Sequence, residues 1–362
     1  MLATEALTEA HRQTGICNSC RYCEGICAVF PALERRLTFA EGDIDYLANL
    51  CHACGACYHD CQYAPPHEFG INFPVAMAEV RAESYGRYAW PGFLAPAFER
   101  NGLVIAIMTA LAVAAFIGGF MAFGSTEIMF STQTGSGAFY RIMPHNVMAA
   151  LFGGVFLFSM IALWMGLRNF WMATGGGRVT WAAFRGAGAA AATLRNLDGG
   201  GGGCMNTDED PDDKRRHYHH MTFYGFLLCF ASTSVATLQH YLFGWEAPYA
   251  WYNLAVILGT VGGFGLVIGP LGLWKEKKSR LTEIRTSTGG MDQAFILMLF
   301  LTGLTGLLLL FLRATPAMGT LLAIHLGVVF ALFLSFAYGK FVHGIYRYAA
   351  LVRNEMEAAT EK

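Results

Sequence analysis

The sequence CNSCRYCEGIC at residues 17–27 returns with the same spacing as CHACGACYHDC at residues 51–61. Each segment has the pattern C-x2-C-x2-C-x3-C, and together they contain eight of the ten cysteines. In two-cluster proteins with this pattern, three cysteines of a run bind one [4Fe-4S] cluster and the fourth binds the other. The spacing therefore predicts two clusters with crosswise ligands. One would be held by Cys17, Cys20, Cys23 and Cys61, and the other by Cys51, Cys54, Cys57 and Cys27.

Disulfides and zinc sites fit these cysteines less well. Disulfides belong to oxidising compartments, and the N-terminal MLATEALTEAHRQ does not resemble a basic and apolar signal peptide. Zinc ligands usually come as two separated pairs rather than as a run of four. Proline does not directly follow either run but is displaced to Pro31 and to Pro65 and Pro66, so we expect the local turn to differ from that of small bacterial ferredoxins.

The composition predicts an all-α protein with a soluble part and a membrane part. Hydrophobic residues make up 54% and charged residues 14% of the chain, which is too apolar for an ordinary soluble protein. The net charge of −1 argues against a nucleic-acid partner. Residues 6–13 and 32–50 have helical apolar spacing, and residues 62–100 read as a linker with a short helix at 74–83. We expect a mostly helical two-cluster domain at 1–95 and a membrane domain at 96–362.

Six apolar segments approach or exceed the ~20 residues that a membrane-spanning helix needs. Lysine and arginine gather in the long connection 168–218 and in the connection that follows the fourth span, which predicts that both are cytoplasmic. An even number of spans would place both termini and the cysteine domain on that side, in the inner membrane of a bacterium. The spans are expected near residues 103–123, 144–167, 220–242, 249–273, 292–313 and 317–340.

The connection 168–218 contains three further features. Residues 178–197 could form an amphipathic helix on the membrane surface. Gly199–Gly203 and the acidic residues after them are interpreted as a flexible solvated loop, with a docking surface for a soluble partner as the alternative. Cys204 is expected to be a surface thiol, and Cys229 a small core residue of the third span. The acidic residues are Asp208, Glu209, Asp210, Asp212 and Asp213.

Histidines within or near the spans are candidate ligands of haem b, because an imidazole inside a bilayer is costly. His325 and His343 are expected on the last span, where 18 residues would place them on one face, about 27 Å apart. The expected partners are His220 for His343 and His240 for His325. His219, which is closer in angle to His240, and His145 are further candidates, with hydrogen-bonded interfacial histidines as the alternative. C-x-x-C-H is absent, so covalent haem is not expected.

The chain resembles the tricarballylate (citrate) utilisation protein B family over nearly its whole length. The resemblance implies membrane-bound iron–sulfur and haem proteins that reoxidise the reduced flavin of a partner dehydrogenase, which converts tricarballylate to cis-aconitate, with quinone as the acceptor. The membrane half resembles, more loosely, the haem b subunits of respiratory nitrate reductase and heterodisulfide reductase. The segments that carry the family resemblance are CNSCRYCEGICAVFP, LCHACGACYHDCQYAPPHEFGINFP, LDGGGGGCMN and HHMTFYGFLLCFASTSVATLQHY.

These observations predict an electron-transfer subunit without a substrate-dehydrogenating site of its own. No G-x-G-x-x-G follows a predicted strand, so we expect the flavin to be bound by another polypeptide. One alternative is a membrane oxidoreductase that acts directly on a small substrate. A second is a redox-sensing or transport protein regulated by its clusters, although transporters usually have internal repeats and broken spans.

Overall fold

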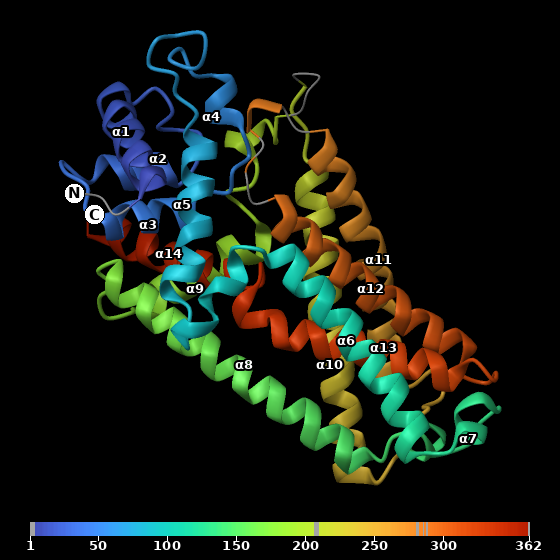
Figure 1. The fold of residues 1–362 in the computed structure, drawn as a ribbon. Helices are drawn as coiled ribbons and strands as arrows, with labels where there is room; N and C mark the ends of the chain where they lie inside the picture. The colour runs from blue at the N-terminus through green and yellow to red at the C-terminus, as the bar shows by residue number, and fades with distance from the viewer. Residues whose placement is uncertain (1–3, 206–209, 280–281, 285, 287–288, 361–362) are drawn as a thin grey trace.

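The computed structural model describes residues 4–205, 210–279, 282–284, 286 and 289–360. Within these ranges the regular structure is helical, and the extended pairing is limited to an isolated antiparallel bridge between Cys204 and Asp212. The predicted all-α fold is therefore confirmed. Figure 1 shows a cluster of short helices at one end of a bundle of long ones, with both chain termini in that cluster.

The N-terminal part is built from five helices. The last of them, Phe73–Tyr88, buries residues on one face at helical spacing, among them Phe73, Met77 and Val80. The side chain of Asn72 caps its first turn by accepting from the Val75 amide at 3.4 Å. The short helix predicted at 74–83 is therefore present and extends beyond both ends of that range. The prediction of a linker is wrong for this segment, because its apolar face completes the domain core. The five helices are α1 (Glu5–Cys20), α2 (Val29–Glu34), α3 (Glu41–Leu50), α4 (Ala56–His59) and α5 (Phe73–Tyr88).

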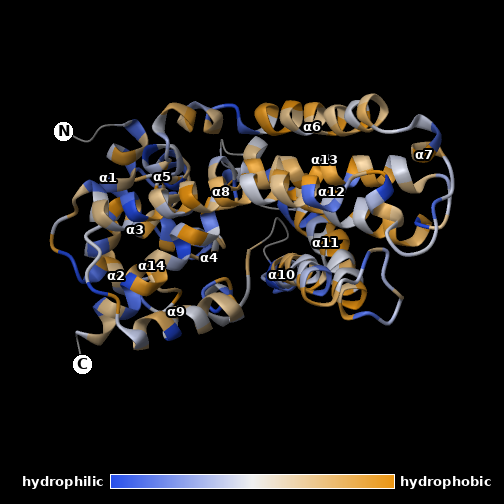
Figure 2. Cartoon of the chain, turned by 90° about the horizontal axis from the view of Figure 1, so that it is seen from below, coloured by the Kyte–Doolittle hydropathy of each residue, from blue (hydrophilic) through white to orange (hydrophobic). Residues whose placement is uncertain are grey.

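Within the described ranges, six helices are long and apolar enough to cross a membrane. Figure 2 shows apolar residues over much of the bundle, whereas polar and apolar residues alternate in the N-terminal part. α13 is the most enclosed, and it packs against α6 and α12. The six are α6 (Asn101–Phe123), α8 (His145–Ala173), α10 (Lys214–Phe243), α11 (Leu254–Lys278), α12 (Gly289–Leu312) and α13 (Met318–Ser335). The shorter helices between and after them are α7 (Thr126–Phe130), α9 (Trp181–Thr193) and α14 (Val342–Ala359).

Glycines allow α10 and α11 to pack closely along their length. A Cβ atom added at Gly262 would lie 2.8 Å from both the amide nitrogen and the Sγ of Cys229. At Gly269 it would lie 2.5 Å from the Oγ1 of Thr222. Small residues at such contacts bring helix backbones together, which is a principal source of association between helices in a membrane. The glycine-rich sequence of α11 therefore fixes the position of α10.

The last predicted span is interrupted, and this changes the place of His343. α13 ends at Ser335, a 3-10 turn follows at Phe336–Tyr338, and α14 begins at Val342. The Asn101 side chain donates to the Tyr338 carbonyl at 2.6 Å and so satisfies a group that helix ends leave free. The expectation that His325 and His343 share one helix is therefore wrong.

α9 and α14, from the far half of the sequence, complete the N-terminal core. Ala183, Ala187 and Ala190 of α9 and Ala350 to Val352 of α14 are buried against helices α1 to α5. The helix expected over 178–197 is thus present. Its apolar side faces α14 and the domain, while Trp181 stays exposed.

An ion-pair cluster fastens α14 to the N-terminal domain. Arg353 donates to Asp43 at 3.1 Å and to Glu357 at 2.8 Å, and it also reaches the Thr174 carbonyl. Arg36 pairs with the same two carboxylates, at 2.9 Å from Asp43. The four side chains are at most 23% exposed, so solvent screens these interactions only in part.

Replacing Arg353 with alanine is expected to destabilise the protein by about 1–3 kcal/mol, because charged hydrogen-bond partners are left behind in a mostly buried cluster. Thermal unfolding of the purified full chain, followed by near-ultraviolet circular dichroism, measures the loss as a lower midpoint. Arg195→Ala is the control, since the Arg195–Glu355 pair has a side chain that is 60% exposed and such pairs contribute little. Equal midpoints for the two variants would contradict the prediction.

Candidate metal centres

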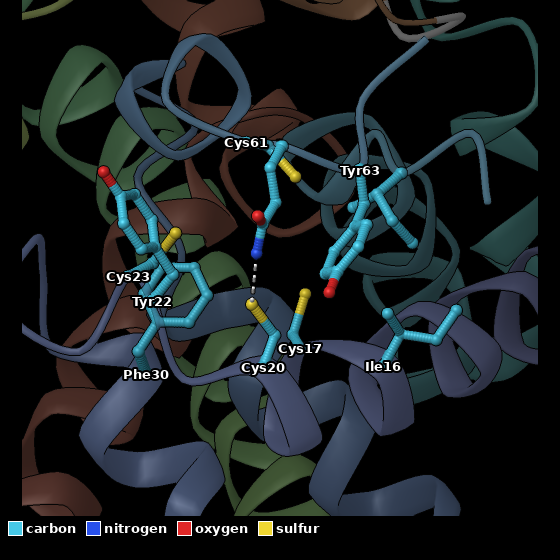
Figure 3. A pocket seen from close by; sticks show the side chains of 10 residues that line it. Ile16, Cys17, Cys20, Tyr22, Cys23, Phe30, Cys61 and Tyr63 are labelled. Atoms are coloured by element: carbon cyan, nitrogen blue, oxygen red, sulfur yellow. Dashed lines mark hydrogen bonds between the residues drawn. The ribbon is translucent and has the colours of Figure 1, made fainter. Parts of the chain in front are cut away.

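The first cysteine group joins both runs around one cavity. Cys17 and Cys20 lie in the last turn of α1, Cys23 lies in the turn that follows, and Cys61 comes shortly after α4. All four line the same cavity, where Figure 3 shows their side chains (this set is the outer quartet). The Gln62 amide donates to Cys20 Sγ at 3.7 Å, which is the dashed contact in Figure 3.

The second cysteine group is the complementary set. Cys27 from the first run joins Cys51, Cys54 and Cys57 around a second cavity (the inner quartet). The loop between Cys51 and α4 reverses through Ala53 and Gly55, which have φ angles of 48° and 91°. The left-handed region is accessible to glycine at little cost, so Gly55 suits this position. Each cavity is thus lined by one of the two groups of four cysteines that the sequence predicts, and their crosswise ligation of clusters stays a prediction.

Burial disfavours the thiolate form of several cysteines in both quartets. Burial, followed by repulsion from Cys61, raises the pKa of Cys17 to about 12. Burial, followed by repulsion from Cys204, raises the pKa of Cys54 to about 11. Thiolates are the form that binds iron, so cluster assembly would release protons from these sites. Each quartet offers four cysteine sulfurs, which is the ligand set of one [4Fe-4S] cluster.

The glycine-rich connection covers the inner quartet instead of extending into solvent. Cys204 is 3% exposed and packs with Cys54, Leu197 and Met205. The Met205 amide donates to the Cys54 carbonyl at 3.2 Å. The prediction of a surface thiol at Cys204 is therefore wrong. Of the solvated loop predicted over Gly199–Gly203, Gly200, Gly201 and Gly202 are exposed, whereas Gly203 is buried.

The acidic run after this loop is described only in part. Asp208 and Glu209 lie outside the described residues, and Asp210 is exposed. Asp212 binds Lys214 at 2.6 Å, and Asp213 binds Arg216 at 2.6 Å. These two carboxylates therefore stabilise the first turn of α10.

Two histidines meet where α10 and α14 begin. The ring centroids of His219 and His343 are 6.3 Å apart, and the ring planes meet at 76°. A metal–imidazole nitrogen bond is about 2 Å long, so two imidazoles on opposite sides of one iron have centroids about 6 Å apart. The Nδ1 of His343 contacts the Lys340 carbonyl, which leaves Nε2 as the ligand atom. The buried Nδ1 of His219 has no partner among the described residues.

His220 does not meet His343 as expected. Its Nε2 lies 3.2 Å from the Ala192 carbonyl at the end of α9. Neighbouring residues on a helix point about 100° apart, so one position decides which histidine faces α14. The pair that fits a bis-histidine iron at this end is His219 and His343.

The histidines at the other end of the bundle are arranged differently. His145, at the start of α8, stacks on His240 near the end of α10, with centroids 3.5 Å apart. This spacing leaves no room for an iron between the rings, although both buried Nδ1 atoms are without partners among the described residues. His325 lies instead at the α12–α13 contact, with Nδ1 2.9 Å from Thr305 Oγ1. The expected pairs of His240 or His145 with His325 are not formed.

Arginine side chains connect the loop of the inner quartet to the helices that carry His219 and His343. Arg347, one turn after His343 on α14, donates to the Cys51 carbonyl at 2.9 Å and to the Asn49 carbonyl at 3.3 Å. Arg215, one turn before His219 on α10, donates to the Ala53 carbonyl at 2.9 Å. Sequence reasoning missed both arginines, and the signal that could have found them is their spacing of four residues from a candidate ligand.

The six apolar helices are compatible with a multi-pass membrane protein, and the two groups of four cysteines are typical of an iron–sulfur domain. Residues 10–87 match the model of the citrate utilization protein B Fer4-like domain, and residues 97–362 match that of citrate utilization protein B. The chain is 48% identical to the citrate utilization protein B of Escherichia coli over 358 residues, which are 98% of this chain and 94% of that protein. The chain therefore belongs to the citrate utilization protein B family. No solved structure matches it.

Proposed function

We propose that the chain is an electron-transfer protein of the bacterial inner membrane that reoxidises the reduced flavin of a partner dehydrogenase. In this proposal residues 1–95 form the cytoplasmic domain with two [4Fe-4S] clusters, ligated as the outer and inner quartets. Residues 96–362 form the membrane domain, with haem b at its cytoplasmic end. The membrane quinone pool is the final acceptor. The substrate of the partner would be tricarballylate or a related citrate-like acid, on the strength of the family name.

The observation that carries the proposal is the set of contacts that links the inner quartet to the helices of two histidines. The cysteines of the outer quartet are all partly exposed, whereas two of the inner quartet, Cys51 and Cys54, are buried. Arg347 and Arg215 join the loop of the inner quartet to the helices that carry His343 and His219. When bound, a [4Fe-4S] cluster carries one electron at a time, which divides the two-electron oxidation of a flavin into single steps.

Metal and haem analysis of the anaerobically purified full chain tests the proposal. We expect about eight non-haem irons and about eight acid-labile sulfides per chain, with haem b in an oxidised-minus-reduced spectrum. One haem per chain would match the His219–His343 pair. Two haems per chain would require the stacked rings of His145 and His240 to separate. Clusters without haem would contradict the proposal and favour a regulatory role for the N-terminal domain.

A further inference from the structure

Three arginines surround the loop of the inner quartet without a carboxylate partner. Arg81 donates to the Cys51 carbonyl at 2.6 Å and to the Ala48 carbonyl at 3.1 Å. Arg347 bonds the Cys51 carbonyl as well, and Arg215 bonds the carbonyls of Ala53 and His52. Among the ion pairs of the described residues, none includes these guanidinium groups.

These positive charges are costly where they lie. Arg81 is 7% exposed, and the charge of a buried group is tolerated only when something compensates it. Arg347 is half-buried, and an arginine side chain keeps its charge at neutral pH. Glu276 interacts with Arg215 at longer range but forms no ion pair with it among the described residues. Carbonyl oxygens satisfy the hydrogen bonds of the three arginines but do not neutralise their charge.

A cluster in the inner quartet would supply the missing negative charge. Four thiolates around an oxidised [4Fe-4S] core give a net charge of about −2, and the addition of one electron makes it about −3. The arginines would therefore stabilise the reduced state more than the oxidised state. Burial of Cys51 and Cys54 acts in the opposite direction, because a low dielectric constant disfavours the more negative reduced cluster. The same low dielectric constant also strengthens the attraction between the cluster and the three arginines.

The outer quartet has a different electrostatic environment. Cys23 interacts with the carboxylate of Asp60, and Cys20 receives a hydrogen bond from the neutral amide of Gln62. Arg12, at the rim of this region, is paired with Glu9 at 2.6 Å. Arg21, which lies between Cys20 and Cys23 in the sequence, donates to the Asn18 carbonyl at 3.1 Å and is exposed to solvent. No set of three buried or half-buried unpaired cations lies around these four cysteines among the described residues.

We infer that Arg81, Arg215 and Arg347 set the reduction potential of the inner quartet's cluster above that of the outer quartet's cluster. The inference rests on the proposed function and gives it a direction. One electron leaves the reduced group at the outer quartet and arrives at the oxidised group at the inner quartet, without a proton or a change of bonds. Flavin electrons therefore enter at the outer quartet and move toward His343 and His219.

Potentiometric titration of the full chain, followed by electron paramagnetic resonance, tests this direction. In Arg347→Gln we expect the inner cluster to lose at least tenfold in its one-electron reduction equilibrium, which is a fall of about 59 mV, while the outer cluster is unchanged. Arg347→Lys keeps the charge and should retain most of the potential. Arg195→Gln removes an exposed charge that is paired with Glu355 and should shift neither cluster.

Arg215→Gln provides an independent variant on another helix, and it carries the test if Arg347→Gln does not fold. The inference is overturned if both cluster potentials stay unchanged in the folded variants, if they fall equally, or if the inner cluster of the unmodified chain has the lower potential. An unmodified chain that contains iron and sulfide but no haem contradicts the proposed function while leaving the cluster potentials measurable. The two failures are therefore distinguishable.

Discussion

Replacement of Cys54 with alanine is expected to abolish one of two cluster signals and to stop haem reduction by a reduced flavin, while haem stays bound. Cys54 is 7% exposed within the inner quartet and supplies one of its four sulfurs. Removing a side chain that hydrogen-bonds a metal ligand typically weakens metal binding about 10–100-fold, so removing a ligand itself should weaken cluster binding at least as much. Haem should remain because His219 and His343 belong to α10 and α14.

Photochemically reduced flavin mononucleotide serves as the electron donor, and the rate of haem reduction is read from the visible spectrum. We expect the rate to fall by at least about 100-fold. Cys204→Ala is the matched control, since this buried thiol packs against Cys54 but lies outside both quartets. Haem reduced at the unmodified rate in Cys54→Ala, or loss of the cluster in Cys204→Ala instead, would refute the assigned quartet.

Replacement of His343 or His219 with alanine should remove one haem per chain and leave the iron–sulfur content unchanged. The two rings have the separation that one iron between them requires, and the Lys340 carbonyl orients His343 for ligation through Nε2. His220→Ala is the control on the adjacent residue, because its ring lies against the Ala192 carbonyl. Haem is measured by its pyridine haemochrome and compared with the non-haem iron.

Retained haem in both His219→Ala and His343→Ala would exclude this pair as the ligands. Loss of haem in His220→Ala alone would instead support His220 as the partner of His343, which was the pairing expected from the sequence. The same assay on His325→Leu tests the remaining prediction that His325 binds haem. Its ring contacts Thr305 and no other histidine among the described residues.

The cysteine groups were predictable because their spacing is local. The fourth cysteine of each run follows the third by four positions, and this offset is enough to direct it to the other site. The six spans were also predictable, since length and hydropathy are properties of the segment alone. A break such as the one after Ser335 was not, because the Asn101 amide that satisfies the freed carbonyl comes from another helix.

The histidine partners and the arginines depend on tertiary contacts that sequence periodicity does not contain. A change of one residue in the orientation of α10 exchanges His219 for His220. Arg347 bonds the carbonyl of Cys51, which lies 296 residues earlier in the chain, and a backbone carbonyl has no side-chain identity to reveal the contact. A hydrogen bond from a side chain to a distant backbone carbonyl can be identified only when the positions of both segments in the fold are known.

The contribution of α14 to the N-terminal core has a consequence for biosynthesis. Ala350, Leu351 and Val352 fill a core whose other residues lie mostly in the first 80 positions, so the cysteine domain emerges from the ribosome with an open apolar face. About 300 further residues must be translated, which takes roughly 15–60 s at about 5–20 residues per second. During that interval the eight cysteines are in a partly assembled domain, and cluster insertion has either to precede closure or to wait for the last helix.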